Sequence, residues 1–163
     1  MASDLIAAAK DLVAREGWLL DQRKWDEWLD LYLENAEYWL PCWKDEYTLT
    51  DDPQKEISLI YYASRAGLED RVFRIRTKRS LASTPLPRTC HIVQVASVTQ
   101  MENGDICVES NWVTYSYKQE QTHNFFGQQQ HILRMSNGAL RIAKRKIVVA
   151  NDVVPNVLDI YSV

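Results

Sequence analysis

The stretch EISLIYYASRAGLEDRVFRIRTKRSLASTPLPRTCH, residues 56–91, contains the patterns that decide how this chain folds. It opens with an apolar run at residues 57–62, which is short and rich in strand-forming residues and predicts a short buried strand or the start of a helix. Two prolines near its end force extended backbone before a new strand begins around His91. Between them, three apolar residues recur at helical spacing and predict a helix: Leu68, Val72 and Ile75.

The remaining faces of this predicted helix become strongly basic toward its C-terminal end. The side chains concerned are Arg74, Arg76, Lys78 and Arg79, with Arg88 beyond the prolines. One interpretation is a helix face exposed to solvent. The other is a contact surface, because arginines at this density usually bind carboxylates or carbonyls. The residues by themselves favour neither interpretation.

Three motifs in this region resemble those of one protein family. They are Asp52-Pro53-Gln54, Gly67-Leu68-Glu69-Asp70-Arg71 and Pro87-Arg88-Thr89. Residues 49–91 as a whole resemble the signature region of the small (beta) subunit of aromatic-ring-hydroxylating dioxygenases, most closely in the benzoate, toluate and anthranilate branch. The resemblance runs nearly end to end, although Ile92-Val93-Gln94-Val95 stands where many relatives have Leu-Val-Ser-Asn.

The resemblance implies both a fold and a role. The fold is α+β, with N-terminal helices packed into a curved, cone-shaped antiparallel sheet like that of nuclear transport factor 2 and the cystatins. The role is that of a non-catalytic, structural subunit in a multicomponent Rieske non-haem iron dioxygenase that cis-dihydroxylates a benzoate-like aromatic carboxylate. The large (alpha) subunit is then expected to carry a Rieske 2Fe–2S cluster and mononuclear Fe(II), with electrons supplied from NADH through a reductase. This chain would form a homotrimer within a heterohexamer of three large and three small subunits.

Residues expected at contacts with other subunits are aromatic or basic. They are Trp43, Arg65, Arg74, Arg76, Arg79, Arg88 and Tyr161. Six Trp and eight Tyr are a heavy aromatic load for 163 residues. Such side chains serve either a large core or a protein interface.

The length and composition of the chain limit the classes of protein to which it can belong. The chain is expected to form a single domain spanning residues 1–163, long enough to bury roughly 70% of its unfolded surface. Its net charge of −3 argues against nucleic-acid binding. Three widely spaced cysteines suit a reducing cytoplasm better than a disulfide framework. The first residues lack the pattern of a signal peptide, and no apolar run approaches the ~20 residues of a membrane span.

The rest of the chain predicts helices first and long strands afterwards. Ser3 can cap an amphipathic helix of about five turns, in which Glu16 breaks the apolar spacing. A second helix is expected at residues 24–34, because Trp25, Trp28, Leu29 and Tyr32 would share one face. A first strand is expected at 36–41, followed by a long surface loop at 43–55. Four long strands are expected at residues 89–100, 105–118, 125–135 and 139–150, with hairpin signals such as Asn103-Gly104. The tail, residues 151–163, is apolar enough to dock on the body of the protein.

The sequence offers poor ligands for a redox metal. A Rieske cluster needs two Cys and two His on apposed loops, whereas Cys90 and His91 are adjacent and would point to opposite faces of a strand. A 2-His-1-carboxylate iron site would have to use His91, His123 or His131, and the latter two would lie about 26 Å apart in an extended strand. No residue of this chain is therefore expected to bind a metal or a cofactor.

The alternative function is that of a stand-alone cone-fold isomerase or dehydratase acting on a small apolar substrate. Such domains can carry an acid–base residue in a pocket inside the sheet, and the candidates are His91, Asp105, Glu109 and Tyr115. Against this, bulky Trp, Tyr and Phe side chains are expected to fill the cavity. Cysteine nucleophiles are less favoured, because Cys42 and Cys107 lie in apolar strands, where a thiol usually packs. No residue is therefore expected to be catalytic.

A second basic cluster lies on the last predicted strand, at Arg141, Lys144, Arg145 and Lys146. Alternation splits these charges between the two faces of the sheet, and a charge that points inward needs a partner. The acidic loop at residues 45–56 is a candidate partner for either basic cluster, within this chain or on a neighbouring one.

Overall fold

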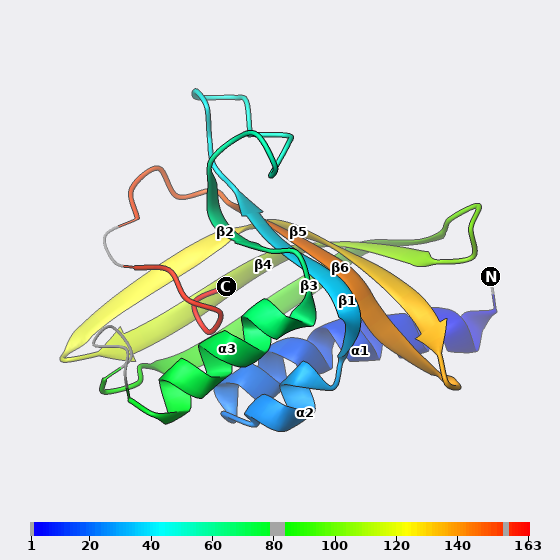
Figure 1. The fold of residues 1–163 in the computed structure, drawn as a ribbon, viewed down its shortest axis with the longest axis horizontal. Coiled ribbons are helices and arrows are strands. Elements are labelled where there is room, and N and C mark those ends of the chain that lie inside the picture. Colours follow the sequence, from blue (N-terminus) through cyan, green and yellow to red (C-terminus); the bar gives the residue numbers. More distant parts are fainter. Residues whose placement is uncertain (1, 79–83, 155–156) are drawn as a thin grey trace.

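A computed structural model describes residues 2–78, 84–154 and 157–163 of the chain. The described part forms one strongly curved sheet with helices packed on its concave face (Figure 1). The strand order is β2-β1-β6-β5-β4-β3, and neighbouring strands are antiparallel except β1 and β6, which run parallel. The predicted α+β class with a curved, mostly antiparallel sheet is confirmed.

The helices are α1 (Ser3–Asp21), α2 (Trp25–Leu29) and α3 (Arg65–Arg76). The apolar run of the opening stretch forms a strand, β2 (Ser58–Tyr62), which pairs with β1 (Tyr32–Pro41) at one edge of the sheet. The long strands are β3 (Arg88–Gln100), β4 (Ile106–Lys118), β5 (Gln121–Ser136) and β6 (Ala139–Val149). None of the described helices combines the length and the apolar character that a membrane-spanning helix needs.

The long strands are joined by tight hairpins with left-handed turn residues. Gly104 (φ +87°) lies in the turn between β3 and β4, and Asn137-Gly138 (φ 50° and 79°) connects β5 to β6. The hairpin between β4 and β5 turns at Gln119-Glu120, which both have positive φ. Neither residue type signals such a turn, so the sequence placed the start of β5 at residue 125. The strand instead begins at Gln121, where its pairing with β4 starts.

The second helix is much shorter than predicted. The expected helix over residues 24–34 is wrong, because only α2 forms and β1 begins at Tyr32. The backbone that follows α2 finds its partners in the sheet and on α3. The Ile142 N–H of β6 donates to the Leu31 carbonyl at 2.7 Å, and the Arg65 guanidinium donates to the Tyr32 carbonyl at 3.0 Å. Trp28 and Tyr32, whose spacing favoured a helix, are both buried in the same core.

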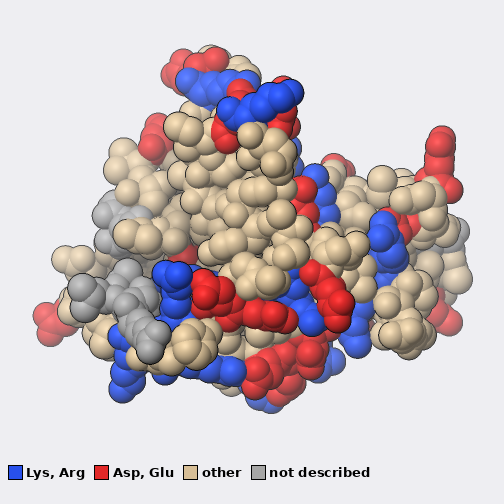
Figure 2. Space-filling view, in the orientation of Figure 1, with Lys and Arg blue, Asp and Glu red and all other residues tan. Residues whose placement is uncertain are grey.

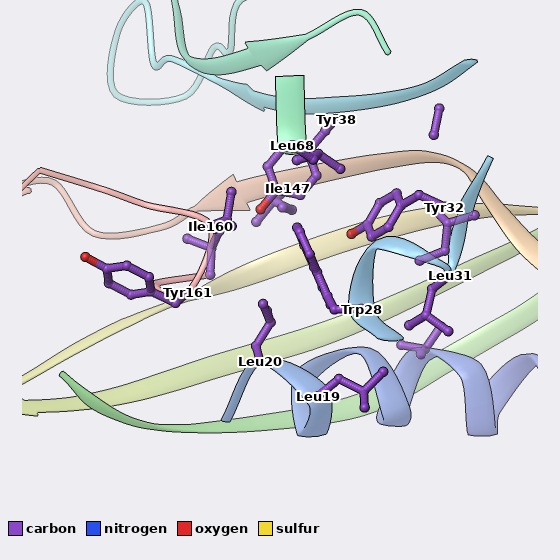
Figure 3. Packing of buried hydrophobic residues seen from close by; sticks show 14 of the residues in the cluster. Leu19, Leu20, Trp28, Leu31, Tyr32, Tyr38, Leu68, Ile147, Ile160 and Tyr161 are labelled. Atoms are coloured by element: carbon purple, nitrogen blue, oxygen red, sulfur yellow. The ribbon is translucent and has the colours of Figure 1, made fainter. Parts of the chain in front are cut away.

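The core fills the space between the helices and the sheet (Figure 3). Trp28 lies at its centre, between Leu20 of α1 and Ile147 of β6. Its ring meets the Tyr32 ring edge-on, with the centroids 5.1 Å apart. Tyr38 is also fully buried. Bulky aromatic side chains therefore occupy the interior of the cone, as the sequence predicts, and burying each one contributes roughly 1.5–3 kcal/mol.

The end of the tail docks on the body of the protein, as predicted, whereas Val153 and Val157 earlier in the tail are each 73% exposed. Asp159 forms an ion pair with Arg71 of α3, in which the Arg71 Nε and Asp159 Oδ1 are 2.8 Å apart. This pair sets Ile160 into the core, where its side chain is fully buried (Figure 3). The carbonyl oxygen of Val163 lies 3.2 Å from the His91 Nε2 of β3. The last described segment therefore completes the core and does not hang free.

Gly17→Ala in α1 is expected to lower the stability of the protein. Gly17 lies so close to β3 that an added methyl group would be 2.7 Å from the His91 Cβ. Helix propensity favours Ala by about 1 kcal/mol, but overpacking costs about 1–3 kcal/mol, so the midpoint of urea unfolding should fall. Lys10→Ala, on the exposed face of the same helix, should stay within about 0.5 kcal/mol of wild type. A raised midpoint for Gly17→Ala would contradict the close approach of α1 to β3.

Candidate functional site

A polar cluster with paired charges lies inside the cone, surrounded by the apolar core. Its central residues are Glu16 of α1, His131 of β5 and Arg145 of β6, each at most 2% exposed. Glu16 Oε1 accepts hydrogen bonds from Arg145 Nη1 at 2.7 Å, Tyr32 Oη at 2.6 Å and Trp28 Nε1 at 3.1 Å. Its other oxygen lies 3.3 Å from His131 Nε2. One carboxylate thus binds α2, β1, β5 and β6 to α1.

Arg145 is the inward-pointing charge that alternation along the last strand predicts. Its Nε and Nη2 donate to Gln129 Oε1 at 3.2 and 2.8 Å, and its guanidinium carbon lies 5.6 Å from the centre of the Tyr38 ring. Its charge is balanced by Glu16, and not by the acidic loop that the sequence offered as a partner. Sequence reasoning treated Glu16 only as a break in the helix pattern. The sequence signal that could have identified Glu16 is a single acidic residue within the buried stripe of a helix, because such a charge needs a partner.

Two opposing effects set the charge states in this cluster. Burial raises the pKa of Glu16, but the positive charge of Arg145 and the hydrogen bonds from His131 and Tyr32 outweigh it and bring the pKa down to about 2. For His131, burial lowers the pKa by more than the neighbouring carboxylate raises it. His131 is therefore neutral at pH 7, and its Nε2–H donates to Glu16. The ion pair of the interior is Glu16 with Arg145.

This cluster is suited to holding elements together and not to acid–base turnover. General acid–base catalysis needs a group whose pKa lies near the working pH and which the substrate can reach. Glu16 is ionised far below neutral pH, and both of its oxygens are engaged. The Nδ1 of His131 has no hydrogen-bond partner among the described residues, but the whole side chain is buried. The space that a substrate would need is occupied by Trp28 and Tyr32 (Figure 3).

Two of the acid–base candidates, His91 and Asp105, make structural contacts at separate places. His91 Nδ1 lies 2.5 Å from Asp21 Oδ1, and its backbone N–H donates to Asp21 Oδ2 at 2.9 Å. Burial raises the pKa of Asp21, but the hydrogen bonds from His91 and Thr89 prevail and lower it. Asp105 accepts hydrogen bonds from Arg134 at 2.9 and 2.7 Å, which lower its pKa. Both carboxylates are therefore committed to fixed partners.

The other two candidates, Glu109 and Tyr115, lie on the outer face of the sheet. Glu109 accepts a hydrogen bond from Ser97 at 3.0 Å, and Tyr115 is 45% exposed. Burial raises the pKa of the Cys42 and Cys107 thiols, which disfavours the nucleophilic thiolate. These side chains do not converge with His91 or Asp105 on one site.

The three histidines are dispersed over the fold. His131 lies in the interior, His91 packs against α1, and His123 lies near the hairpin between β4 and β5. Cys90 is exposed whereas His91 is turned inward, as expected of neighbours on a strand. Within residues 2–78, 84–154 and 157–163, no three His, Cys, Asp or Glu side chains are grouped so that they could hold a metal.

The predicted interface residues differ widely in exposure. Trp43 is 41% exposed, and its Nε1 donates to the Val149 carbonyl at 2.8 Å. Arg88 is exposed at the start of β3, whereas Tyr161 is only 6% exposed and belongs largely to the core. Arg79 lies outside the described residues. The contact role of all these residues stays a prediction.

The basic side chains of α3 and β6 do not meet the acidic loop of their own chain. Within the described residues, the expectation of that contact is wrong for Arg74, Arg76 and Lys144, because nearer carboxylates take these charges. The pairs are Arg65 with Glu69 at 2.9 Å, Arg74 with Asp70 at 3.0 Å, Arg76 with Asp26 at 2.8 Å and Lys144 with Glu37 at 2.8 Å. The loop supplies its own counter-charge, since Lys44 pairs with Glu56. A contact with the loop of a neighbouring chain stays a prediction.

The sequence and the fold both match known proteins. A family model for the ring hydroxylating beta subunit matches residues 15–156. The chain belongs to this family. It is 46% identical over 156 residues to the 2-halobenzoate 1,2-dioxygenase small subunit of Burkholderia cepacia, with 94% of each chain covered. The predicted family membership is thus confirmed.

Solved structures extend the match of this ring hydroxylating beta subunit to the fold. The beta subunit of the benzoate 1,2-dioxygenase from Burkholderia mallei has 37% sequence identity and a TM-score of 0.79, over 96% of each chain. An NTF2-like protein with a cystatin-like fold from Novosphingobium aromaticivorans gives a TM-score of 0.61 at 16% identity, over 94% of this chain and 88% of that one. This second likeness concerns the fold alone. The predicted cone-shaped fold is confirmed.

Removing one partner of the interior ion pair should destabilise this beta subunit strongly. Glu16→Leu or Arg145→Met alone leaves a buried charge uncompensated, and each should lower the free energy of unfolding by about 3–5 kcal/mol. The double variant should lose clearly less than the sum of the two, as measured by urea unfolding in a double-mutant cycle. Arg74→Met, which removes an exposed pair of similar length, is the control and should cost less than about 1 kcal/mol. Additive losses would mean that the two residues do not form one unit.

The stability of this beta subunit should fall as the pH falls. His131 has a lowered pKa in the fold, so below about pH 6.5 the unfolded chain takes up a proton that the folded one does not. Glu16 goes from 4.5 unfolded to about 2 folded, so its stabilisation is complete above pH 4.5. That stabilisation, about 3 kcal/mol, is lost between pH 4.5 and 2. Urea unfolding at a series of pH values should show a shallower acid decline in the double variant Glu16→Leu/Arg145→Met than in wild type.

Proposed function

We propose that this chain is the non-catalytic small subunit of a multicomponent Rieske non-haem iron dioxygenase that cis-dihydroxylates a benzoate-like aromatic carboxylate. The observation that carries the proposal is membership of the ring hydroxylating beta subunit family over residues 15–156. The relatives described above are subunits of a 2-halobenzoate and a benzoate dioxygenase. The interior of this chain agrees with a structural role, because its charged groups are paired with one another and its space is filled by aromatic side chains.

The redox groups of the proposed enzyme do not fit this chain. A Rieske cluster takes two Cys and two His ligands, but Cys90 and His91 face opposite sides of β3, and His91 is held by Asp21. We therefore assign the Rieske 2Fe–2S cluster and the mononuclear Fe(II) to the large (alpha) subunit, with electrons from NADH delivered through a reductase. This chain then contributes by holding the large subunits in place.

The proposed assembly is a heterohexamer in the cytoplasm, in which three copies of this chain form a ring. A closed threefold ring is built from head-to-tail contacts between two different surfaces of one chain. The whole chain, residues 1–163, acts in it as a single domain. Permanent complexes of this kind bury roughly 2,000–5,000 Å² per interface. The exposed aromatic and basic residues of this chain, such as Trp43 and Arg88, supply suitable surface for such contacts.

The alternative, a stand-alone isomerase or dehydratase, finds less support in the structure. It requires an acid–base residue that faces a substrate cavity in the cone. His91 and Asp105 are bound to fixed partners, and Glu109 and Tyr115 face outward. Soaking the isolated protein with small aromatic ligands separates the two functions, because only the enzyme predicts saturable binding inside the cone.

Coexpression tests the proposed role directly. The purified chain alone should contain far less than one iron per chain and should not oxidise benzoate. Coexpression with the large subunit of a 2-halobenzoate or benzoate dioxygenase should yield a stable complex with iron in the large subunit, measured by metal analysis and size-exclusion chromatography. About one iron per copy in this chain alone would contradict the proposal, and so would turnover of an aromatic substrate without a large subunit.

A further inference from the structure

Two helices of this chain end beside one groove, and each ends with a basic residue in a left-handed conformation. After α1, Arg23 has φ 55°, with its N–H bonded to the Leu20 carbonyl at 3.0 Å and the Lys24 N–H bonded to the Leu19 carbonyl at 2.9 Å. After α3, Lys78 has φ 54° and its N–H reaches the Ile75 carbonyl at 3.3 Å. The hydrogen bonds after α1 are those of a Schellman motif, and the bond after α3 is one of its two.

Arg23 has a partner within its own chain, because its Nη2 donates to the Pro87 carbonyl at 3.3 Å. Local stability does not explain the Lys78 side chain. The left-handed position after a helix normally holds glycine, because any Cβ there is strained. A cation near the end of a helix does interact favourably with the helix dipole, but it can do so from the last turn without this strain. Side chains kept where the backbone disfavours them point to a use outside the helix.

The groove between the two helix ends has a volume of about 390 Å³. Its cationic side chains are Arg23, Arg76 and Lys78. Arg76 is paired with Asp26 and Arg23 donates to the Pro87 carbonyl, so Lys78 is the cation that an incoming group would meet. The other lining residues of the groove are Trp25, Ile75, Thr84, Pro85 and Leu86, so the described lining contains no carboxylate. Figure 2 shows Lys and Arg side chains at the lower left, among other places, and α1 and α3 end on this side in Figure 1. The groove therefore fits an aromatic or apolar side chain that is flanked by an acidic group.

Such a segment exists on this chain, in the loop at residues 43–56. This loop projects from the body at the top of Figure 1 and carries five acidic against two basic side chains. At its tip, Tyr47 is 86% exposed and follows directly after Asp45 and Glu46. The tip is held in shape, because Asp45 Oδ1 accepts hydrogen bonds from the N–H groups of Tyr47 and Thr48 at 2.9 and 2.8 Å. A preformed loop that holds out one tyrosine has the properties of a binding anchor.

We propose that the Tyr47 tip of one copy inserts into the groove of a second copy, with Glu46 facing Lys78. The loop projects at the top of Figure 1, whereas α1 and α3, whose ends border the groove, end at the lower left, so the tip of one copy does not reach its own groove. The contact is head-to-tail, which is the kind of contact that the proposed threefold ring requires. The occupant is a second copy because the chain itself carries, beside the exposed Tyr47, an acidic residue that complements the charge of Lys78. This inference deepens the proposed assembly role and rests on it.

A disulfide cross-link tests the contact in the coexpressed complex. The variant carries Glu46→Cys and Lys78→Cys in a Cys90→Ser background, because Cys90 is the exposed native cysteine in the described chain. Oxidation should give covalent dimers and trimers of this chain in denaturing gels, and neither single cysteine variant should do so. The control pair Glu102→Cys/Lys78→Cys, with the exposed Glu102 in the β3–β4 turn, should not cross-link copies. Absence of the cross-link at residues 46 and 78, or a cross-link from residue 46 to the large subunit, would overturn the proposal.

A charge swap provides a second measurement. Glu46→Lys and Lys78→Glu alone should each raise the concentration at which the complex dissociates by about tenfold. The combined swap should bring it back to within about threefold of wild type. Tyr47→Ala should raise it by about thirtyfold, whereas Trp18→Ala, an exposed aromatic on α1, should not. A combined swap as weak as the sum of the single variants would contradict the pairing.

The two proposals fail in different ways. If the chain does not copurify with a large subunit, but its copies still cross-link through residues 46 and 78, the dioxygenase role falls and the contact stands. If the complex forms and contains no such cross-link, the contact falls and the dioxygenase role stands.

Discussion

The ion pair between Glu16 and Arg145 is the constraint on which the rest of the structure depends. Removing two charges from water costs several kcal/mol for each ion, and the pair is tolerable only with good geometry and further hydrogen bonds. Glu16 receives hydrogen bonds from Trp28, Tyr32 and Arg145, and Arg145 donates to Gln129 as well. Every one of these partners must be in place at once. The pair therefore fixes α1 against β6 and sets the aromatic side chains around it.

The same ion pair explains why the interior of this cone is a packed core and not a substrate pocket. The fold can hold a substrate pocket, but here the central carboxylate is used to join elements, and Trp28 and Tyr32 fill the space beside it. A pKa of about 2 keeps Glu16 ionised at neutral pH, so it is a permanent counter-charge and not a proton carrier. The residues that serve the function are then expected on the surface of the molecule, which agrees with membership of the ring hydroxylating beta subunit family.

The surface of the molecule carries residues that do not stabilise the fold of the single chain. A left-handed non-glycine residue costs about 1–2 kcal/mol, whereas a favourable dipole contact returns about 0.3–1 kcal/mol. Lys78 thus remains a net cost for the isolated chain on these values, whereas Arg23 also donates to the Pro87 carbonyl of its own chain. The exposed Tyr47 likewise adds nothing to the core, since 86% of it faces solvent. Partner contacts give a reason for keeping such residues.

The sequence by itself determined the family, the fold class and most of the elements. Helical spacing of Leu68, Val72 and Ile75 found the buried stripe of α3, and strand alternation indicated that a charge on β6 would point inward. These features are local, because each depends on the periodicity of one segment. The motifs around residues 49–91 carried the family resemblance, which no physical pattern in the chain could have supplied.

Only the tertiary structure decided which partners meet. Glu16 and Arg145 are 129 positions apart, and no periodicity links them, so the acidic loop looked an equally good counter-charge. The second helix was overestimated because Trp28 and Tyr32 have helical spacing, whereas the pairing of β1 with β6 claims the backbone from Tyr32 onward. Long-range hydrogen bonds of this kind override local preference. The tertiary structure also places the ends of α1 and α3 beside one groove, which the sequence did not indicate.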